Sequence, residues 1–332
     1  QVSNPAEQRA AAQKAMQQGN WKVAYDQFRP LCLDEKNDPK LVGDDLAKAV
    51  QCLNNLGRTN EVDEFIEATI KVHEKNWRLL QAAAHQFAFA QHQGFIIAGK
   101  FERGHHRGGG KLVNSIERDR HRALQLMTQG IPFAKVDDDK AQVGNFFLQF
   151  GELLINHRGI YEAWRLQYLS DLKTLPDHDE GWPQGREYNG ASVDAEGKPV
   201  YHYTPKSWDE AKTDGERWRW VLEQAAENNP AIRGNVKMQL ANFWQQMFGV
   251  ESMQHGRWGG NFFGGVDDDD TKKNESGTWA LHTLKDDETI AKLASGIKRF
   301  TLPDEFNSLK LYQELAKEEA GIPKDLSQHA IP

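Results

Sequence analysis

The stretch that decides the fold reads Gly19-Asn20-Trp21-Lys22-Val23-Ala24-Tyr25-Asp26-Gln27-Phe28. A helix is expected to end at Gly19, and the next is expected to begin at or just after Asn20. The aromatic and alanine positions of the second helix then fall at i, i+3, i+4 and i+7, which makes a single apolar stripe. Two helices joined by so short a turn pack antiparallel. The stretch therefore predicts a helical hairpin.

The same unit recurs along the chain with altered spacing. Gly57 follows Gly19 after 38 residues, whereas the tetratricopeptide repeat is about 34 residues long. A third pair is expected from Trp77, with its second helix ending before Pro132, and a fourth pair is expected on either side of Gly159. The predicted fold is therefore all-α, with tetratricopeptide-like helical hairpins in a curved solenoid, a small inserted β-hairpin and long loops.

Interruptions of the helical pattern divide the chain into four predicted segments. Residues 1–175 are expected to form an array of about four hairpins, with a loop insertion at 99–114. Residues 176–206 are expected to hold the β-hairpin, because 193–201 reads as two short strands around a Glu-Gly turn. A further helical pair is expected in 207–254, starting at a Ser207 capping box. Residues 255–332 are expected to form a long Gly/Asp-rich loop and two short helices, near 286–294 and 305–318.

Charge and hydropathy exclude several classes of partner. The chain has 41 basic and 48 acidic residues, which gives a formal net charge of −7. This balance argues against nucleic acid or an anionic membrane as the main partner. No apolar run approaches the roughly 20 residues that a membrane-spanning helix needs. With 39% hydrophobic and 27% charged residues, we expect a globular protein rather than a disordered one.

The two cysteines, Cys32 and Cys52, lie late in consecutive predicted helices. Both are about equally far from the connection between those helices, so they are expected to lie side by side in antiparallel neighbours. A disulfide between them is one interpretation, and two buried unpaired thiols are the other.

The catalytic motifs fail on inspection. Gly108-Gly109-Gly110-Lys111 is similar to a phosphate-binding loop, but His105 stands where that motif needs glycine and Leu112 where it needs Ser or Thr. His73-Glu74 begins like a zinc-protease helix, but Trp77 replaces the second histidine. We therefore predict neither a catalytic residue nor a cofactor, and an enzyme of unknown type is kept only as a third hypothesis.

The candidate binding residues lie in the loops. A weak, irregular calcium site is predicted at Asp267, Asp268, Asp269 and Asp270, although an EF-hand would need glycine at Lys272. The alternative is a charged, solvated loop. The candidate interaction residues are His105, His106, Trp182, Trp258, Phe262 and Phe263. Their aromatic rings can stack on sugars or can anchor a loop to the core.

Three segments resemble the N-terminal region of large bacterial alpha-2-macroglobulin-like proteins. They are Glu162-Ala163-Trp164-Arg165-Leu166-Gln167, Asp214-Gly215-Glu216-Arg217-Trp218-Arg219-Trp220, and the run from Thr278 through Asp286-Asp287-Glu288-Thr289-Ile290-Ala291-Lys292-Leu293 to Phe306. The resemblance covers most of the chain. It implies a secreted or periplasmic, cell-envelope setting and a helical leader that precedes macroglobulin β-sandwiches.

Full-length members of that family trap proteinases, using a thioester formed within a Cys-x-Glu-Gln motif. Cys32 is followed by Asp34-Glu35 and Cys52 by Asn54-Asn55, so no thioester role carries over to this chain. The leading hypothesis is a non-catalytic scaffold or docking module of a secreted, protease-trap-like protein, whose partner is another protein or the remainder of a longer chain. The alternative is a free-standing cell-envelope module that binds protein, carbohydrate or calcium.

Overall fold

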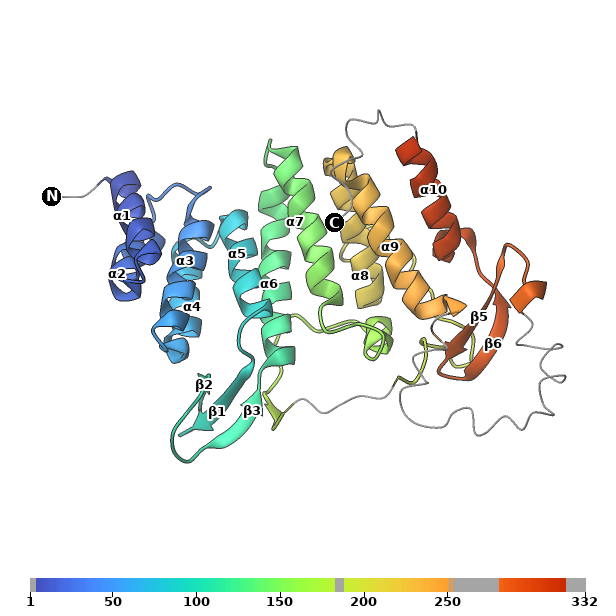
Figure 1. Cartoon of the computed structure of the whole chain (residues 1–332), viewed down its shortest axis with the longest axis horizontal. Helices are drawn as coiled ribbons and strands as arrows, with labels where there is room; N and C mark the ends of the chain where they lie inside the picture. The colour runs from blue at the N-terminus through green and yellow to red at the C-terminus, as the bar shows by residue number, and fades with distance from the viewer. Residues whose placement is uncertain (1–3, 183–187, 251, 253–280, 321–332) are drawn as a thin grey trace. The chain divides into compact units, whose positions relative to one another are not determined.

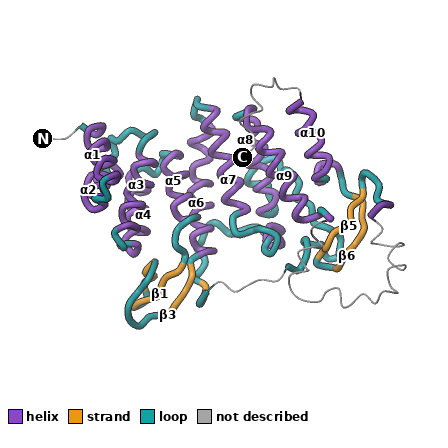
Figure 2. Tube along the Cα trace, viewed as in Figure 1, coloured by secondary structure: helices purple, strands orange, loops and turns teal. Residues whose placement is uncertain are grey.

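The computed structural model describes residues 4–182, 188–250, 252 and 281–320. Over these ranges the chain is mostly helical, with a four-stranded antiparallel sheet and a separate two-stranded hairpin (Figure 1, Figure 2). The all-α prediction is therefore right for the helical majority and wrong for the two sheets. Two compact units share the chain: residues 1–156 with 170–184 form unit 1, and residues 157–169 with 185–332 form unit 2.

The helices of unit 1 follow one another in chain order (Figure 1). Those in the described part of unit 1 are α1 (Pro5–Gln17), α2 (Trp21–Cys32), α3 (Val42–Asn55), α4 (Val62–Val72), α5 (Trp77–Ala88), α6 (Ile116–Lys135) and α7 (Lys140–Ile155). The opening hairpin is confirmed, since Gly19 separates α1 from α2 with a φ of 74°. A positive φ strains any residue with a Cβ, which is why glycine ends this helix.

The apolar stripe of the opening hairpin lies in the core of unit 1. Phe28 is completely buried, and the Tyr25 ring meets Phe65 of α4 edge to face, with the ring centroids 5.6 Å apart. The predicted stripe of α7 is also confirmed, because Phe146, Phe147 and Phe150 are fully buried. Side chains of α2 and α4 therefore pack directly against each other, and the aromatic stripe of α7 lies in the core of the same unit.

Half of the loop predicted at 99–114 is strand. The strands β1 (Gln93–Ile97), β2 (Lys100–Arg103), β3 (Lys111–Asn114) and β4 (Asp179–Glu180) form a sheet in the order β2-β1-β3-β4, with all neighbours antiparallel. Ala98 and Gly99 join β1 to β2 with φ angles of 49° and 80°. Two central residues with positive φ define a type I′ hairpin turn.

The glycine-rich segment 104–110 connects β2 to β3 across β1. Since β2 and β3 are both antiparallel to β1, they run parallel to each other. Parallel strands usually need a crossover of about a dozen residues or more, and this one is shorter. Gly104, Gly108 and Gly110 have φ angles of 94°, 140° and 152°, which residues with side chains rarely adopt. The tight crossover thus explains why this segment is rich in glycine, and so why its sequence is similar to a phosphate-binding loop.

Two helix predictions in this region are wrong. Helix α6 does not stop before Pro132 but runs through it to Lys135, where Ile131 and Ala134 are buried. The helix expected after Gly159 is only a 3-10 turn, η2 (Ala163–Gln167), in which Trp164 is 42% exposed. Helix α7 therefore lacks the antiparallel partner that was predicted to complete a fourth hairpin.

Unit 2 is built around an aromatic core. Its remaining described elements are α8 (Asp214–Asn228), η3 (Pro230–Ile232), α9 (Arg233–Phe248), η6 (Leu281–Thr283), β5 (Glu288–Leu293), β6 (Gly296–Thr301), η7 (Asp304–Phe306) and α10 (Ser308–Ala320). Trp218, Trp244 and Phe306 are all buried, and the Trp244 ring stacks on Phe248 at a centroid distance of 5.5 Å. The hydroxyl of Thr289 donates to the Phe248 carbonyl at 2.6 Å and joins β5 to α9.

Three local predictions for unit 2 differ from the structure. The segment 286–294 was expected to be helical, but most of it is strand β5. The hairpin expected at 193–201 forms only in short form, with one antiparallel bridge between Val193 and Pro199 and backbone hydrogen bonds from Asp194 to Lys198 and from Val200 to Ser192. The helix expected from Ser207 begins instead at Asp214, where the Thr213 hydroxyl accepts a hydrogen bond from the Glu216 amide at 3.0 Å.

Candidate functional site

A polar groove of about 730 Å³ crosses helices α3, α5 and α7 of unit 1. Helices α3 and α5 are the first helices of successive hairpins, and α7 packs beside α5 and α6. The lining residues are Lys40, Gly43, Asp44, Ala47, Trp77, Arg78, Gln81, Ala82, His85, Gln86, Asp139, Gln142 and Gln149. All of these residues except Lys40 and Asp139 lie in the three helices, so the hollow is formed mainly by helical residues rather than by the inserted loops.

The floor of the groove is made of small residues where α3 and α5 come close together. A Cβ atom added at Gly43 would lie 3.0 Å from Cβ of Ala82 and 3.2 Å from the Arg78 carbonyl oxygen. Neither contact can relax by moving the end of a flexible side chain. Gly43 therefore sets the separation of the two helices and the depth of the groove between them.

Replacing Gly43 with Ala is expected to lower the unfolding free energy of unit 1 by about 1 kcal/mol. Overpacking costs about 1–3 kcal/mol and outweighs the gain of up to about 1 kcal/mol from removing a helical glycine. Urea unfolding followed by circular dichroism measures the change. Gly109→Ala is the matched control, because a Cβ there has no atom within 4 Å. A stabilised Gly43→Ala protein would contradict the proposed close approach.

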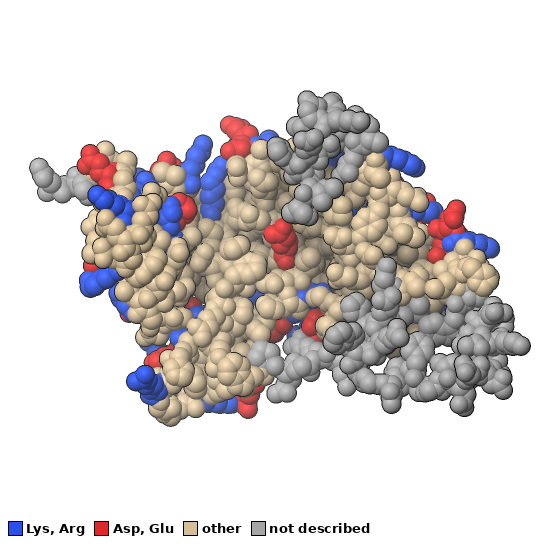
Figure 3. Space-filling view, viewed as in Figure 1, with Lys and Arg blue, Asp and Glu red and all other residues tan. Residues whose placement is uncertain are grey.

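The walls of the groove carry side-chain amides. Nε2 of Gln81 donates to Oε1 of Gln149 at 2.8 Å, which links α5 to α7. Gln86 and Gln142 add two more amides to the lining. The charged residues are balanced, with Lys40 and Arg78 against Asp44 and Asp139. Basic and acidic side chains are likewise interspersed on the face of the molecule shown in Figure 3. The groove thus offers hydrogen bonds without a dominant charge.

One end of the groove is fixed by a cluster at the start of α5. The Asn76 side chain caps the helix by accepting from the Arg78 amide at 3.1 Å. The Arg78 guanidinium lies 4.1 Å from the centroid of the Trp77 ring. Both side chains donate to the same Asp137 oxygen, Nη1 of Arg78 at 2.6 Å and Nε1 of Trp77 at 2.9 Å. The hydrogen bond from Arg78 is the main reason that the pKa of Asp137 lies below its usual range.

The opposite end lies beside an exposed aromatic ring. His85 lines the groove, and its ring lies 4.4 Å from that of Phe89, measured between centroids. The Phe89 side chain is 61% exposed although it is a large apolar residue. Aromatic residues, phenylalanine among them, are enriched in interaction surfaces relative to the rest of a protein surface.

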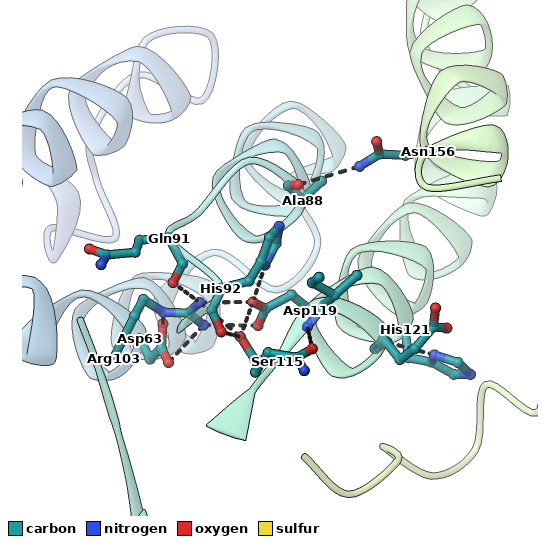
Figure 4. A network of polar contacts seen from close by, with 12 residues as sticks. Asp63, Ala88, Gln91, His92, Arg103, Ser115, Asp119, His121 and Asn156 are labelled. Atoms are coloured by element: carbon teal, nitrogen blue, oxygen red, sulfur yellow. Dashed lines mark hydrogen bonds and ion pairs between the residues drawn. The ribbon is translucent and has the colours of Figure 1, made fainter. Parts of the chain in front are cut away.

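A buried polar cluster attaches the sheet to the helices of unit 1 (Figure 4). Arg103 of β2 donates to both oxygens of Asp63 on α4, at 2.8 and 3.0 Å, and to both oxygens of Asp119 on α6, each at 2.8 Å. Asp119 also accepts from Nδ1 of His92 at 2.8 Å and from the Ser115 hydroxyl at 2.6 Å. Burial favours the neutral form of Asp119, but the hydrogen bonds from His92 and Arg103 outweigh it and lower its pKa.

This cluster contains Ser, His and Asp but is not arranged as a hydrolase triad. In such a triad the serine hydroxyl bonds to the histidine ring. The Ser115 hydroxyl instead donates to Asp119 and lies 3.0 Å from the His92 carbonyl oxygen. Ser115 is also only 1% exposed. The geometry suits a structural anchor for the sheet.

The residues predicted from the sequence do not converge on one site within the described residues. His105 is exposed, whereas His106 lies half-buried with its Nδ1 3.8 Å from Glu102. Trp182 is 58% exposed. The remaining candidates lie outside the described ranges: Trp258, Phe262, Phe263, Asp267, Asp268, Asp269 and Asp270. No group of three or more His, Cys, Asp or Glu that could hold a metal ion occurs among the residues described.

Cys32 and Cys52 are both buried and both are free thiols. Burial raises the pKa of each. Since thiolate is the reactive form of cysteine, these groups are held in their unreactive state. Of the two interpretations of the cysteines, the structure shows the unpaired one.

The groove itself was missed from the sequence, although a signal for it exists. Gln81, His85 and Phe89 follow one another at intervals of four along α5 and its end, beside the buried stripe that contains Leu80 and Ala84. Residues four apart share one face of a helix. A polar and aromatic face next to a core stripe marks a surface that is open to solvent.

Comparisons with known proteins give no independent assignment, since no family model, no curated protein and no solved structure matches this chain. Among the described helices, none has the length and apolar character needed to cross a membrane.

Proposed function

We propose that the chain is a non-catalytic docking scaffold and that its groove over α3, α5 and α7 binds a polypeptide partner. The observation that carries the proposal is the groove itself, which lies on the first helices of successive hairpins and is lined by hydrogen-bonding groups. In a stack of repeats this surface is the one that recurs from unit to unit. We extend the proposal to a solenoid arrangement of the hairpins within unit 1.

Polar contacts between successive hairpins support a groove that is formed before the partner arrives. Arg9 of α1 donates two hydrogen bonds to the buried Asp45 of α3, each at 2.7 Å. Arg122 of α6 donates in the same way to Glu67 of α4, again at 2.7 Å twice. A surface that is already ordered loses less entropy on binding. These contacts therefore favour affinity at the groove.

The setting of the scaffold is also a proposal. The resemblance to alpha-2-macroglobulin-like leaders suggests a secreted or cell-envelope protein, in which the docked segment belongs to the remainder of such a chain or to a separate protein. The carbohydrate and calcium hypotheses remain predictions, because Trp258 and Asp267–Asp270 lie outside the described residues.

Selection of random dodecapeptides on the immobilised full chain tests the docking function. The double variant Gln81→Ala, Gln149→Ala is expected to bind the enriched peptides at least about tenfold more weakly, since each lost hydrogen bond is worth about 1 kcal/mol. Gln51→Ala is the matched control, because Gln51 is an exposed glutamine of α3 that does not line the groove. The proposal would be contradicted if no peptide were enriched, or if the enriched peptides bound the double variant as tightly as the Gln51→Ala control.

A further inference from the structure

The hydrogen-bonding groups of the groove restrict the kind of ligand that fits it. A glutamine amide both donates and accepts hydrogen bonds. Four of them, Gln81, Gln86, Gln142 and Gln149, line one hollow. An extended polypeptide presents backbone N–H and C=O groups along its whole length and needs partners for both kinds. A helical ligand would already have satisfied these groups internally.

Three of the four charged residues that line the groove, Asp44, Arg78 and Asp139, already have ion-pair partners. Asp44 forms an ion pair with Lys48 at 2.5 Å, and Arg78 is paired with Asp137 at 2.6 Å and lies 3.8 Å from Asp139. A strongly acidic ligand would have to displace the carboxylates from Arg78. A strongly basic one would meet Lys40 and Arg78. An uncharged segment leaves every one of these pairs in place.

The exposed ring of Phe89 can make an apolar contact with a side chain of the ligand. It follows Gln81 by eight residues, which is about 12 Å along the helix. An extended chain covers that distance in about four residues. A ligand whose backbone meets the Gln81 amide therefore brings a side chain about four residues away onto the Phe89 ring.

We propose that the groove takes an extended, uncharged segment of polypeptide, held by the glutamine amides and anchored by one apolar side chain on Phe89. The proposal rests on the docking function and narrows it to one class of partner. Recognition by amides and apolar contact depends little on ionic strength, in contrast to recognition by exposed charges.

Three dodecapeptide libraries test this inference on the full chain: one without charged residues, one rich in Asp and Glu, and one rich in Lys and Arg. The uncharged library is expected to yield the tightest peptides, with dissociation constants that change less than about twofold between 50 and 500 mM NaCl. Phe89→Ala is expected to weaken them about tenfold, the value of roughly 1.4 kcal/mol of apolar contact. Val23→Ala, which alters an exposed apolar residue of α2, is expected to leave them unchanged.

The outcomes separate this inference from the docking function. Suppose that the selected peptides bind the Gln81→Ala, Gln149→Ala protein more weakly. If these peptides are charged, bind in a salt-sensitive way or bind the Phe89→Ala protein equally well, the inference is overturned and the docking function stands. If no library yields a binding peptide and the chain binds chitohexaose, both this inference and the docking function are overturned. The groove would then be a saccharide-binding groove. The side chains of Gln81, Gln149 and Phe89 are all accessible to solvent, and unchanged circular dichroism confirms that each variant is folded.

Discussion

Replacing Arg103 with Met is expected to lower the unfolding free energy of unit 1 by about 3–5 kcal/mol at pH 7, which is the usual effect of removing one partner from a buried ion pair. The Arg103 side chain is 2% exposed and Asp119 is 5% exposed. Without the guanidinium, the Asp119 carboxylate would remain buried with no cation. The loss is expected in urea unfolding followed by the far-ultraviolet signal.

Arg122→Met is the matched control for Arg103→Met. Its pair with Glu67 spans the same two helices, α4 and α6, but is 22% and 44% exposed, so it is expected to contribute about 0–1 kcal/mol. The lowered pKa of Asp119 means that the cluster stabilises unit 1 fully above the ordinary value of 3.8 and loses this effect as the pH falls below it. Equal losses in the two variants at pH 7 would contradict the anchoring role of the cluster.

Acidification from pH 7 to pH 4 is expected to destabilise unit 2 through His202. The ring is enclosed by aromatic side chains, with Trp244 5.9 Å away between centroids, and a Cβ added at Gly215 would lie 2.2 Å from its Nδ1. Burial, helped by the charge of Arg219, lowers the pKa of His202 from 6.5 to about 4. Below pH 6.5 His202 is protonated in the unfolded chain but stays neutral in the folded unit until the pH approaches 4. Stability therefore falls across this window, by roughly 3 kcal/mol at pH 4.

The test of this acid sensitivity is the pH dependence of unfolding, followed by tryptophan fluorescence. His202→Gln removes the titrating group and is expected to flatten the slope between pH 6.5 and pH 4. His282→Gln changes an exposed histidine of unit 2 and is expected to leave the slope as it is. A native-like slope in the His202→Gln protein would assign the effect to another group.

The helices could be predicted because their sequences repeat an apolar stripe over several turns. Phe28 and Leu46, for example, belong to stripes whose members are all or nearly all buried in the folded unit. The start of α1 has a typical capping sequence, asparagine followed by proline, and the Asn4 side chain accepts from the Ala6 amide at 3.0 Å. A long periodic pattern is the sequence signal that tertiary context changes least.

The strands could not be predicted, because short apolar runs do not distinguish a strand from a helix. In β5, residues 289–291 are buried in succession, so the alternation that marks a strand is absent. The β1–β2 turn uses Ala98-Gly99 rather than the Asn-Gly or Asp-Gly pairs that signal a type I′ turn. Ala98 adopts a φ of 49° because pairing of Ile97 with Lys100 holds the hairpin closed.

The candidate site was harder still, because a groove depends on how separate helices meet. Gln81 and Gln149 are 68 residues apart in the sequence and bond to each other only because α5 packs beside α7. Their residue types are ordinary for a solvated helix face. The same holds for Arg103, whose partners lie on α4 and α6 and share no motif with it.

The route of the chain between the two units also sets the order in which they can be completed on the ribosome. Residues 157–169 belong to unit 2, yet they leave the ribosome before residues 170–184, which belong to unit 1. The later segment supplies strand β4 and the Pro176 carbonyl that accepts from Arg118 at 2.7 Å. During synthesis, the sheet of unit 1 therefore lacks strand β4 until the first segment of unit 2 has emerged from the ribosome.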